Sequence, residues 1–141
     1  MTYVVDTSVF LRWFVEQVGW QHAQQVRDQF LAGEIELLTP EFTRVELAEV
    51  LRKKGLLAGV LDEAEYLDAV QVLDVLEVEI AVLDEAALIR SAALAGRHSL
   101  RMFDAIGAAL ALDCGVTLLT GDAKAAKALT GVVEVEVLKG I

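Results

Sequence analysis

Short apolar runs alternate with amphipathic stretches along the whole chain. Short apolar runs are typical of buried strands, and they span residues 3–6, 35–39, 78–83, 116–120 and 132–137. Amphipathic stretches are typical of helices, and they span residues 20–32, 40–54, 62–76, 84–95, 102–112 and 123–129, with a further helix opening at Thr7. Strands separated by helices predict an α/β fold in which helices cover both faces of a mostly parallel sheet of about five strands. Pro40 is expected in the first turn of its helix.

The length and composition predict one domain spanning residues 1–141. The chain has 141 residues, one proline and no repeat or flexible linker, and typical domains have roughly 100 to 200 residues. No apolar run approaches the roughly 18 residues that a membrane span needs, and the N-terminus lacks the basic and apolar regions of a secretory signal. We therefore expect a cytoplasmic protein with no membrane contact. The single cysteine, Cys114, lies in an apolar run and is expected to be buried.

The charge of the chain is strongly negative. There are 12 basic and 22 acidic residues, which gives a net charge of −10. This balance counts against nucleic-acid binding, which usually needs a basic face. The excess is uneven, because residues 62–85 contain nine acids and no base, whereas bases gather at residues 52–54 and around Arg101 and Lys124. Each basic cluster is either a solvated surface or a contact for phosphates.

Asp6 and Asp122 each follow a predicted strand and precede a predicted helix. In a parallel sheet, ligands bind beyond the carboxyl ends of the strands, where the strand order reverses. Both residues are therefore candidates for a functional site. Aspartate is also a favoured helix N-cap, a role that typically contributes ~1 kcal/mol, so a purely structural role is open for each.

Glu46 and Asp104 occupy helix positions where the pattern predicts apolar side chains. Glu46 has Phe42 four residues before it and Val50 four residues after it. Asp104 is the only hydrogen-bonding side chain in residues 102–112. Carboxylates are almost never buried unless they are paired or bound to a metal. A cap or a buried pair with Arg101 is the structural alternative for Asp104.

Four converging carboxylates would repel one another, since two unit charges ~4 Å apart interact by about 4 kcal/mol at an effective dielectric constant near 20. A divalent cation offsets this repulsion. A site made of carboxylates alone suits Mg²⁺ or Mn²⁺ rather than structural zinc, and we assign no ligand role to His22 or His98. Mg²⁺ held by a few carboxylates bridges to phosphate oxygens, which points to phosphoryl chemistry.

Four segments, residues 4–10, 40–51, 103–111 and 118–122, contain these acids in the order and spacing of the motifs of PIN domains. The chain resembles this family along essentially its whole length, and it is most similar to the VapC toxins of bacterial toxin–antitoxin pairs. The resemblance implies a three-layer fold and a Mg²⁺- or Mn²⁺-dependent endoribonuclease that cleaves RNA phosphodiester bonds. It also implies a homodimer that a cognate antitoxin inhibits.

The resemblance further implies roles for individual residues. Asp6 and Asp104 would be the principal metal ligands, and Glu46 and Asp122 would complete the catalytic site. Hydrogen-bonding support is expected from Thr7, Ser8 and Thr120. Apart from the resemblance, the basic clusters offer candidates to bind the phosphates of RNA, with exposed solubilising side chains as the alternative; they are Arg101, Arg97, Lys124, Arg52 and Lys53. The chain departs from the family in having Ile106 and Gly107 where an aromatic residue is common.

Other classes of protein fit less well. A haloacid-dehalogenase-type phosphatase needs a second aspartate at position 8, which is Ser8, and the glycine-rich phosphate-binding loops do not occur. A catalytically inactive PIN-like interaction module and a housekeeping RNA-processing nuclease without antitoxin are the alternatives that remain. Aromatic residues near the N-terminus predict either core packing or an interface with a second copy or an antitoxin; they are Phe10, Trp13, Phe14 and Trp20.

Overall fold

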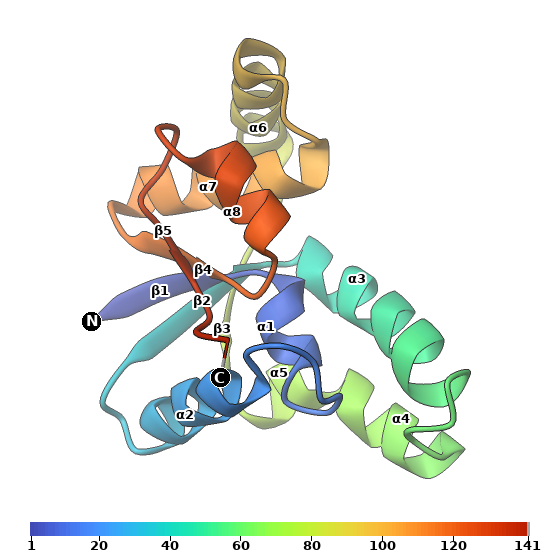
Figure 1. The fold of residues 1–141 in the computed structure, drawn as a ribbon. Coiled ribbons are helices and arrows are strands. Elements are labelled where there is room, and N and C mark those ends of the chain that lie inside the picture. The colour runs from blue at the N-terminus through green and yellow to red at the C-terminus, as the bar shows by residue number, and fades with distance from the viewer. Residues whose placement is uncertain (141) are drawn as a thin grey trace.

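A central sheet organises the computed structural model, which describes residues 1–140 (Figure 1). The strands are β1 (Thr2–Val5), β2 (Glu36–Pro40), β3 (Glu79–Ala81), β4 (Thr117–Thr120) and β5 (Val135–Val137). They lie in the order β3-β2-β1-β4-β5, and every pairing is parallel. The predicted α/β fold with a sheet of about five strands is confirmed, and the sheet is wholly rather than mostly parallel.

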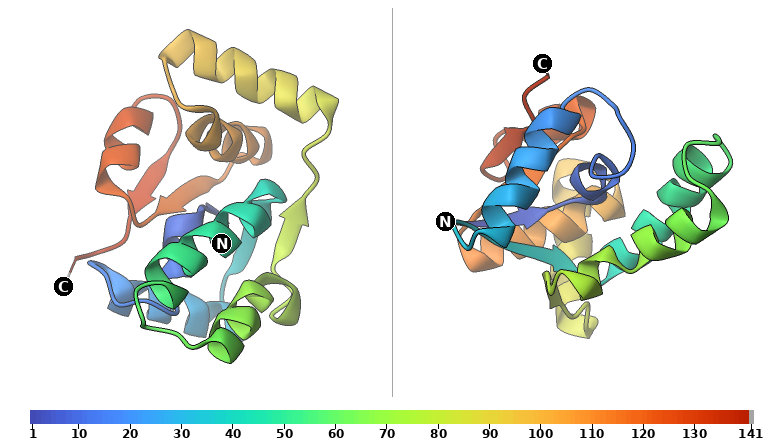
Figure 2. Two further views of the ribbon diagram at one scale, coloured as in Figure 1. Left: turned by 90° about the vertical axis from the view of Figure 1, so that its right-hand side faces the viewer. Right: turned by 90° about the horizontal axis from the view of Figure 1, so that it is seen from below.

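Helices cover both faces of the sheet. They are α1 (Thr7–Leu11), α2 (Trp20–Leu31), α3 (Phe42–Leu51), α4 (Glu63–Val70), α5 (Val72–Val75), α6 (Glu85–His98), α7 (Met102–Cys114) and α8 (Ala123–Leu129), with a π-helical turn η1 (Arg52–Leu56) after α3. In Figure 1, α6, α7 and α8 lie above the sheet, and α1, α2 and α5 lie below it. Helices α3 and α4 project beyond the sheet (Figure 2). Helices on both sides of the sheet give the three-layer arrangement that the sequence predicts.

Two hydrophobic cores lie on opposite faces of the sheet, because successive side chains of a strand point in opposite directions. Val5 and Leu119 belong to the core that includes Phe10 and the helices α1 to α5. Their neighbours Val4 and Leu118 belong to the other core, with the alanine-rich face of α7. The strands are thus buried on both faces, which explains why they read as continuous apolar runs.

Pro40 and Cys114 differ from their predicted placement. Pro40 ends β2, where its ladder partner is Ala81, instead of beginning the next helix. The missing N–H of proline is harmless at this strand end, and the following residue, Glu41, donates its N–H to the oxygen of Ala81 (2.9 Å). Cys114 is exposed rather than buried, and it is the last residue of α7.

Two aromatic residues, one in α1 and one just after it, pack in the core. Phe10 is fully buried, Trp13 is 4% exposed, and their rings meet edge to face with centroids 4.9 Å apart. The indole N–H of Trp13 donates to the oxygen of Ala23 (2.9 Å). Of the two roles that the sequence left open for these two rings, core packing is the one that the structure shows.

Among residues 1–140, none of the helices has the length and apolar character needed to cross a membrane.

Candidate active site

The strand order reverses between β1 and β4. From β1 the chain passes to β2 on one side and later returns to β4 on the other. A crevice outside the carboxyl ends of two such strands is the usual ligand site of an open α/β sheet. Asp6 directly follows β1, and Asp122 comes two residues after β4.

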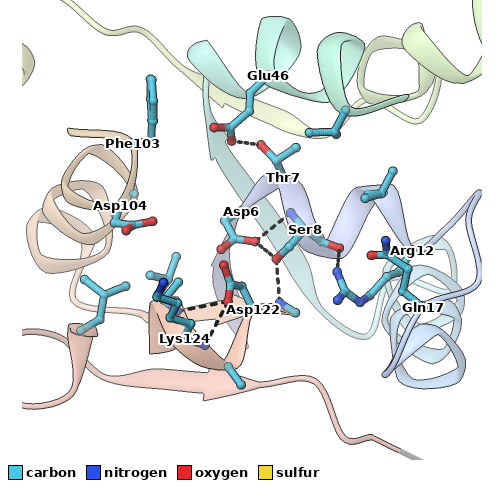
Figure 3. Close-up of a pocket in the computed structure, with 18 of the residues that line it drawn as sticks. Asp6, Thr7, Ser8, Arg12, Gln17, Glu46, Phe103, Asp104, Asp122 and Lys124 are labelled. Atoms are coloured by element: carbon cyan, nitrogen blue, oxygen red, sulfur yellow. Dashed lines mark hydrogen bonds between the residues drawn. The ribbon is translucent and has the colours of Figure 1, made fainter. Parts of the chain in front are cut away.

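A pocket of about 700 Å³ lies at this position, and all four predicted acids line it. Asp6 and Asp122 come from the ends of the central strands, Glu46 from α3 and Asp104 from α7. Their carboxylates turn towards a shared space (Figure 3). The four acids lie as far apart in the sequence as positions 6 and 122, and the fold brings them together, as the parallel topology predicts.

Asp6 caps α1. Its Oδ1 accepts hydrogen bonds from the Ser8 N–H (3.0 Å) and from the Ser8 hydroxyl. Burial raises the pKa of Asp6, hydrogen bonds from Ser8 and Thr120 oppose this rise, and the charge of Glu46 adds to it. Without a cation the ionised form of Asp6 is thus disfavoured by its surroundings.

Asp122 caps α8 in the same manner. Its Oδ1 accepts the N–H groups of Lys124 (2.9 Å) and Ala125 (3.2 Å). The capping bonds of Asp6 and Asp122 are both accepted by Oδ1, so Oδ2 of each takes no part in capping. The structural and the functional interpretation of these two residues are therefore compatible, because capping occupies only part of each carboxylate.

The three predicted supporting residues connect the elements that carry the acids. Ser8 Oγ lies 3.2 Å from Thr120 Oγ1 and accepts the Gly121 N–H (2.7 Å). Thr120 is fully buried, and its Oγ1 accepts the Asp122 N–H (3.1 Å). The hydroxyl of Thr7 donates to Oε1 of Glu46. Hydrogen bonds thus join α1 to both β4 and α3.

Glu46 stands on the wall of the pocket. Helix α3 turns Thr43, Leu47 and Leu51 into the core. Glu46 and Val50 lie on an adjacent line of the helix and line the pocket. Of the two apolar neighbours that made Glu46 conspicuous in the sequence, Val50 therefore lines the pocket at the edge of the core.

Asp104 is paired with Arg101. Their side chains approach to 3.3 Å (Nε to Oδ2), and a second contact measures 3.5 Å (Nη2 to Oδ1). The side chain of Asp104 is 15% exposed, whereas that of Arg101 is 71% exposed. The charge and hydrogen bond of Asp104 raise the pKa of Arg101. The pair that the sequence left open as an alternative is present, and Asp104 nonetheless faces the pocket.

The predicted RNA-binding residues divide into two groups. Arg101 and Lys124 line the pocket. Arg52 and Lys53 do not, because both reach Glu49, at 2.6 Å and 4.0 Å. From this basic run it is Lys54 that lines the pocket. Arg97, in the last turn of α6, is exposed and does not line it.

Arg12 belongs to the site and was missed from the sequence. Its Nη1 donates to the oxygen of Ser8 and its Nε to the oxygen of Val18, both at 2.7 Å. Burial lowers the pKa of Arg12, and the charges of Asp6 and Asp122 oppose this change. The sequence could have indicated that Arg12 lies near the site, because Arg12 follows Ser8 by four residues and so shares its helix face. The arginine places a positive charge in the same pocket as the two central aspartates.

The donor set fits a hydrated hard cation. Among residues 1–140, no group of three or more His, Cys, Asp or Glu side chains stands close enough to hold a metal ion directly. Mg²⁺, however, keeps several waters and needs only one or two carboxylates. The acids that line the pocket offer only oxygen ligands, and neither histidine nor cysteine lines it. These residues suit Mg²⁺ or Mn²⁺ and do not suit a closed zinc site.

Comparisons with known proteins agree with this geometry. The sequence model of the PIN domain matches residues 3–129, a span that includes all four acids. Comparison with curated proteins gives no match. Among solved structures, the chain is similar to a toxin–antitoxin complex from Klebsiella pneumoniae, with a TM-score of 0.70, 20% identity and 99% of each chain covered.

Two structures from Mycobacterium tuberculosis are also similar. The toxin VapC20, described as cleaving the sarcin–ricin loop, has a TM-score of 0.71 and 14% identity, with 91% of this chain and 95% of that one covered. VapBC-5, of the VapBC family of toxin–antitoxin systems, has a TM-score of 0.62 and 23% identity, with 98% of each chain covered. These likenesses concern the fold. The match to the sequence model shows that this chain belongs to the PIN domain family.

Proposed function

We propose that this protein is a Mg²⁺- or Mn²⁺-dependent endoribonuclease and the toxin of a VapBC-type pair. The observation that carries the proposal is the convergence of Asp6, Glu46, Asp104 and Asp122 on one pocket at the switch point of the sheet. Membership of the PIN domain family and the similarity in fold to toxin–antitoxin proteins support it. A similar fold in a toxin that cleaves the sarcin–ricin loop supports RNA as the substrate.

Asp6 and Asp104 would hold the cation, and Asp122 would complete the negative charge around it. A bound divalent ion supplies Lewis-acid activation of water and of the phosphate oxygens. The hydrogen bonds of Ser8 to Asp6 fix that carboxylate before the substrate arrives. Such preorganisation means that little rearrangement is needed during the reaction.

Glu46 is the proposed group that orients the attacking water or takes its proton. Its Oε1 accepts the Thr7 hydroxyl, and Oε2 is left for water. A carboxylate fixed at one oxygen and free at the other is well placed for general-base work. Asp122 is the alternative for this role, because its Oδ2 takes no part in capping.

Arg101 and Lys124 would bind phosphates on either side of the cleaved bond. Both line the pocket, and the exposed guanidinium of Arg101 can reach a strand that lies across its mouth. Phosphate contacts supply most of the affinity for a nucleic-acid backbone. These two basic side chains would therefore give the pocket a local attraction for RNA although the whole chain has a net charge of −10. Contributions from Arg97, Arg52 and Lys53 stay predictions.

A cognate antitoxin and a homodimer complete the proposed function. Similar folds occur in complexes of toxin with antitoxin, among them one from Klebsiella pneumoniae and the VapBC2 complex from Rickettsia felis bound to promoter DNA. An inhibitor of this site is expected to bring positive charge to the four carboxylates. Copurification with the product of a neighbouring short gene tests the antitoxin, and light scattering tests the dimer.

Cleavage of single-stranded RNA with and without Mg²⁺ tests the nuclease. Asp104→Asn is expected to abolish Mg²⁺-dependent cleavage. Asp113→Asn is the matched control, because Asp113 lies on the same helix and pairs with Arg90 outside the pocket (2.9 Å). Equal cleavage by Asp104→Asn and the parent would contradict the proposal. Absence of both Mn²⁺ binding by calorimetry and RNA cleavage would favour a PIN-like interaction module instead.

A further inference from the structure

Two phenylalanine rings stack at the pocket. Phe42 comes from the first turn of α3 and Phe103 from the first turn of α7. Their ring centroids are 5.1 Å apart, and their planes differ by 15°. Phe103 lines the pocket directly beside Asp104 (Figure 3). The pair therefore joins the helix that carries Glu46 to the helix that carries Asp104.

Phe103 is unusual in its exposure. It is 53% exposed, and within residues 1–140 it is the one phenylalanine among the exposed large apolar side chains. Neither ring of the stacked pair belongs to the two hydrophobic cores. Phe42 covers one face of the Phe103 ring, so the exposed area belongs to the other face and the edge. An aromatic face held in this way is ready to bind a flat apolar group at small entropic cost.

The charges around the ring indicate what that group is. Arg101 and Lys124 line the same pocket as Phe103 and the four carboxylates. A nucleotide matches this arrangement, because its phosphate meets the cations while its base offers a π-face. Base stacking on aromatic side chains, combined with cations that follow the backbone, is how proteins bind single-stranded nucleic acid.

We propose that Phe103, supported by Phe42, is a stacking platform for one unpaired base of the RNA next to the phosphate that is cleaved. This inference rests on the proposed ribonuclease function and adds a subsite to it. Stacking requires an exposed base face, so the platform selects single strands and loops over continuous duplex. Every base has such a face, and the platform by itself tolerates any sequence at that nucleotide.

RNA binding, rather than cleavage, tests the platform. The full chain is titrated in EDTA at low salt against a fluorescein-labelled single-stranded RNA, since low salt strengthens phosphate contacts. Phe103→Leu keeps an apolar side chain but removes the aromatic face, and it is expected to bind roughly 5- to 150-fold more weakly. Phe103→Trp is expected to bind at least as tightly as the parent. Leu112→Ala, a 48% exposed control on the same helix, is expected to bind as the parent does.

Abasic substitution locates the base. Replacing one nucleobase at a time with an abasic sugar is expected to weaken binding of the parent at one position, and Phe103→Leu is expected to show little further loss there. If Phe103→Leu binds RNA as tightly as the parent, the platform proposal is wrong. The RNA cleavage assay tests the proposed nuclease activity independently of this result. The platform is also overturned if this variant binds RNA normally but loses a protein partner. If the parent protein neither binds nor cleaves RNA, both the proposed function and the platform are contradicted.

Discussion

Ser8 Oγ lies 3.2 Å from Thr120 Oγ1, and this contact joins the helix after β1 to the end of β4. The same hydroxyl donates to Asp6 and accepts the Gly121 N–H. One small side chain therefore fixes the relative positions of the two strand ends that carry Asp6 and Asp122. The geometry of the carboxylates depends on this connection as much as on the acids themselves.

Removing the Ser8 hydroxyl is expected to destabilise the protein. Ser8→Ala leaves the Gly121 N–H without its partner and removes one of the two hydrogen bonds from residue 8 to Asp6, which should lower the free energy of unfolding by about 1–3 kcal/mol. Urea unfolding monitored by circular dichroism measures this change. Thr2→Ala is the control, because its exposed hydroxyl bonds Glu36 at the opposite end of the sheet, and a change within about 0.5 kcal/mol is expected. Equal stabilities of the two variants would contradict the role given to Ser8.

Gly121 is expected to reject a side chain. A Cβ at this position would lie 2.7 Å from Nη1 and 2.8 Å from Cζ of Arg12. The guanidinium cannot move aside freely, because it donates to two backbone oxygens at 2.7 Å. Gly121→Ala should therefore cost roughly 1–3 kcal/mol and reduce RNA cleavage.

Gly96→Ala is the matched control for that substitution. A Cβ at Gly96 meets nothing within 4 Å, and the residue lies within α6. Alanine favours a helix over glycine by about 0.8–1.0 kcal/mol, so the control is expected to raise the midpoint of thermal unfolding while Gly121→Ala lowers it. A Gly121→Ala variant as stable and active as Gly96→Ala would show that Arg12 is not held as described.

The raised pKa of Asp6 predicts a specific dependence of stability on pH. The pKa of Asp6 is raised from its ordinary value of 3.8 in the folded protein. At pH values between 3.8 and the raised pKa, the folded state therefore binds more protons than the unfolded state. Asp6 therefore lowers the stability of the metal-free protein as pH rises through its folded pKa. Below the ordinary value this effect is absent.

Asp6→Asn removes that titration and keeps an oxygen for the cap. In EDTA, the stability of this variant relative to the parent is expected to increase as pH rises through the raised pKa. Added Mg²⁺ should stabilise the parent and leave the variant nearly unchanged. Urea unfolding at a series of pH values measures the difference. A difference that is constant across the series would mean that burial does not control the ionisation of Asp6.

Most of the architecture was predictable from the sequence. Strands buried on both faces left continuous apolar runs, as at Val4 and Val5, and α8 begins and ends where its pattern predicts. Pro40 was placed wrongly because proline is compatible with both the end of a strand and the first turn of a helix. Cys114 was placed wrongly because a helix end can turn one residue out of an apolar run.

The site was predictable only in part. Asp104 and Glu46 stood out because an apolar pattern makes a carboxylate conspicuous. Arg12 and Lys54 did not stand out, because a basic residue on a helix is ordinary until the fold shows what it faces. The stacked rings of Phe42 and Phe103 come from segments about 60 residues apart, and only the tertiary structure brings them together.

The central claim is that the four carboxylates form one site, in which Asp6 and Asp104 together hold the divalent metal that serves RNA cleavage. The most direct test measures the Mg²⁺-dependent cleavage of single-stranded RNA by Asp6→Asn, Asp104→Asn and the double variant, with Asp113→Asn prepared in the same way as a control. Each single change is expected to reduce the rate roughly a thousandfold. The double variant should lose little more than either single variant, because both residues serve the same ion. Parental rates in either single variant, or losses that multiply fully in the double variant, would contradict the claim.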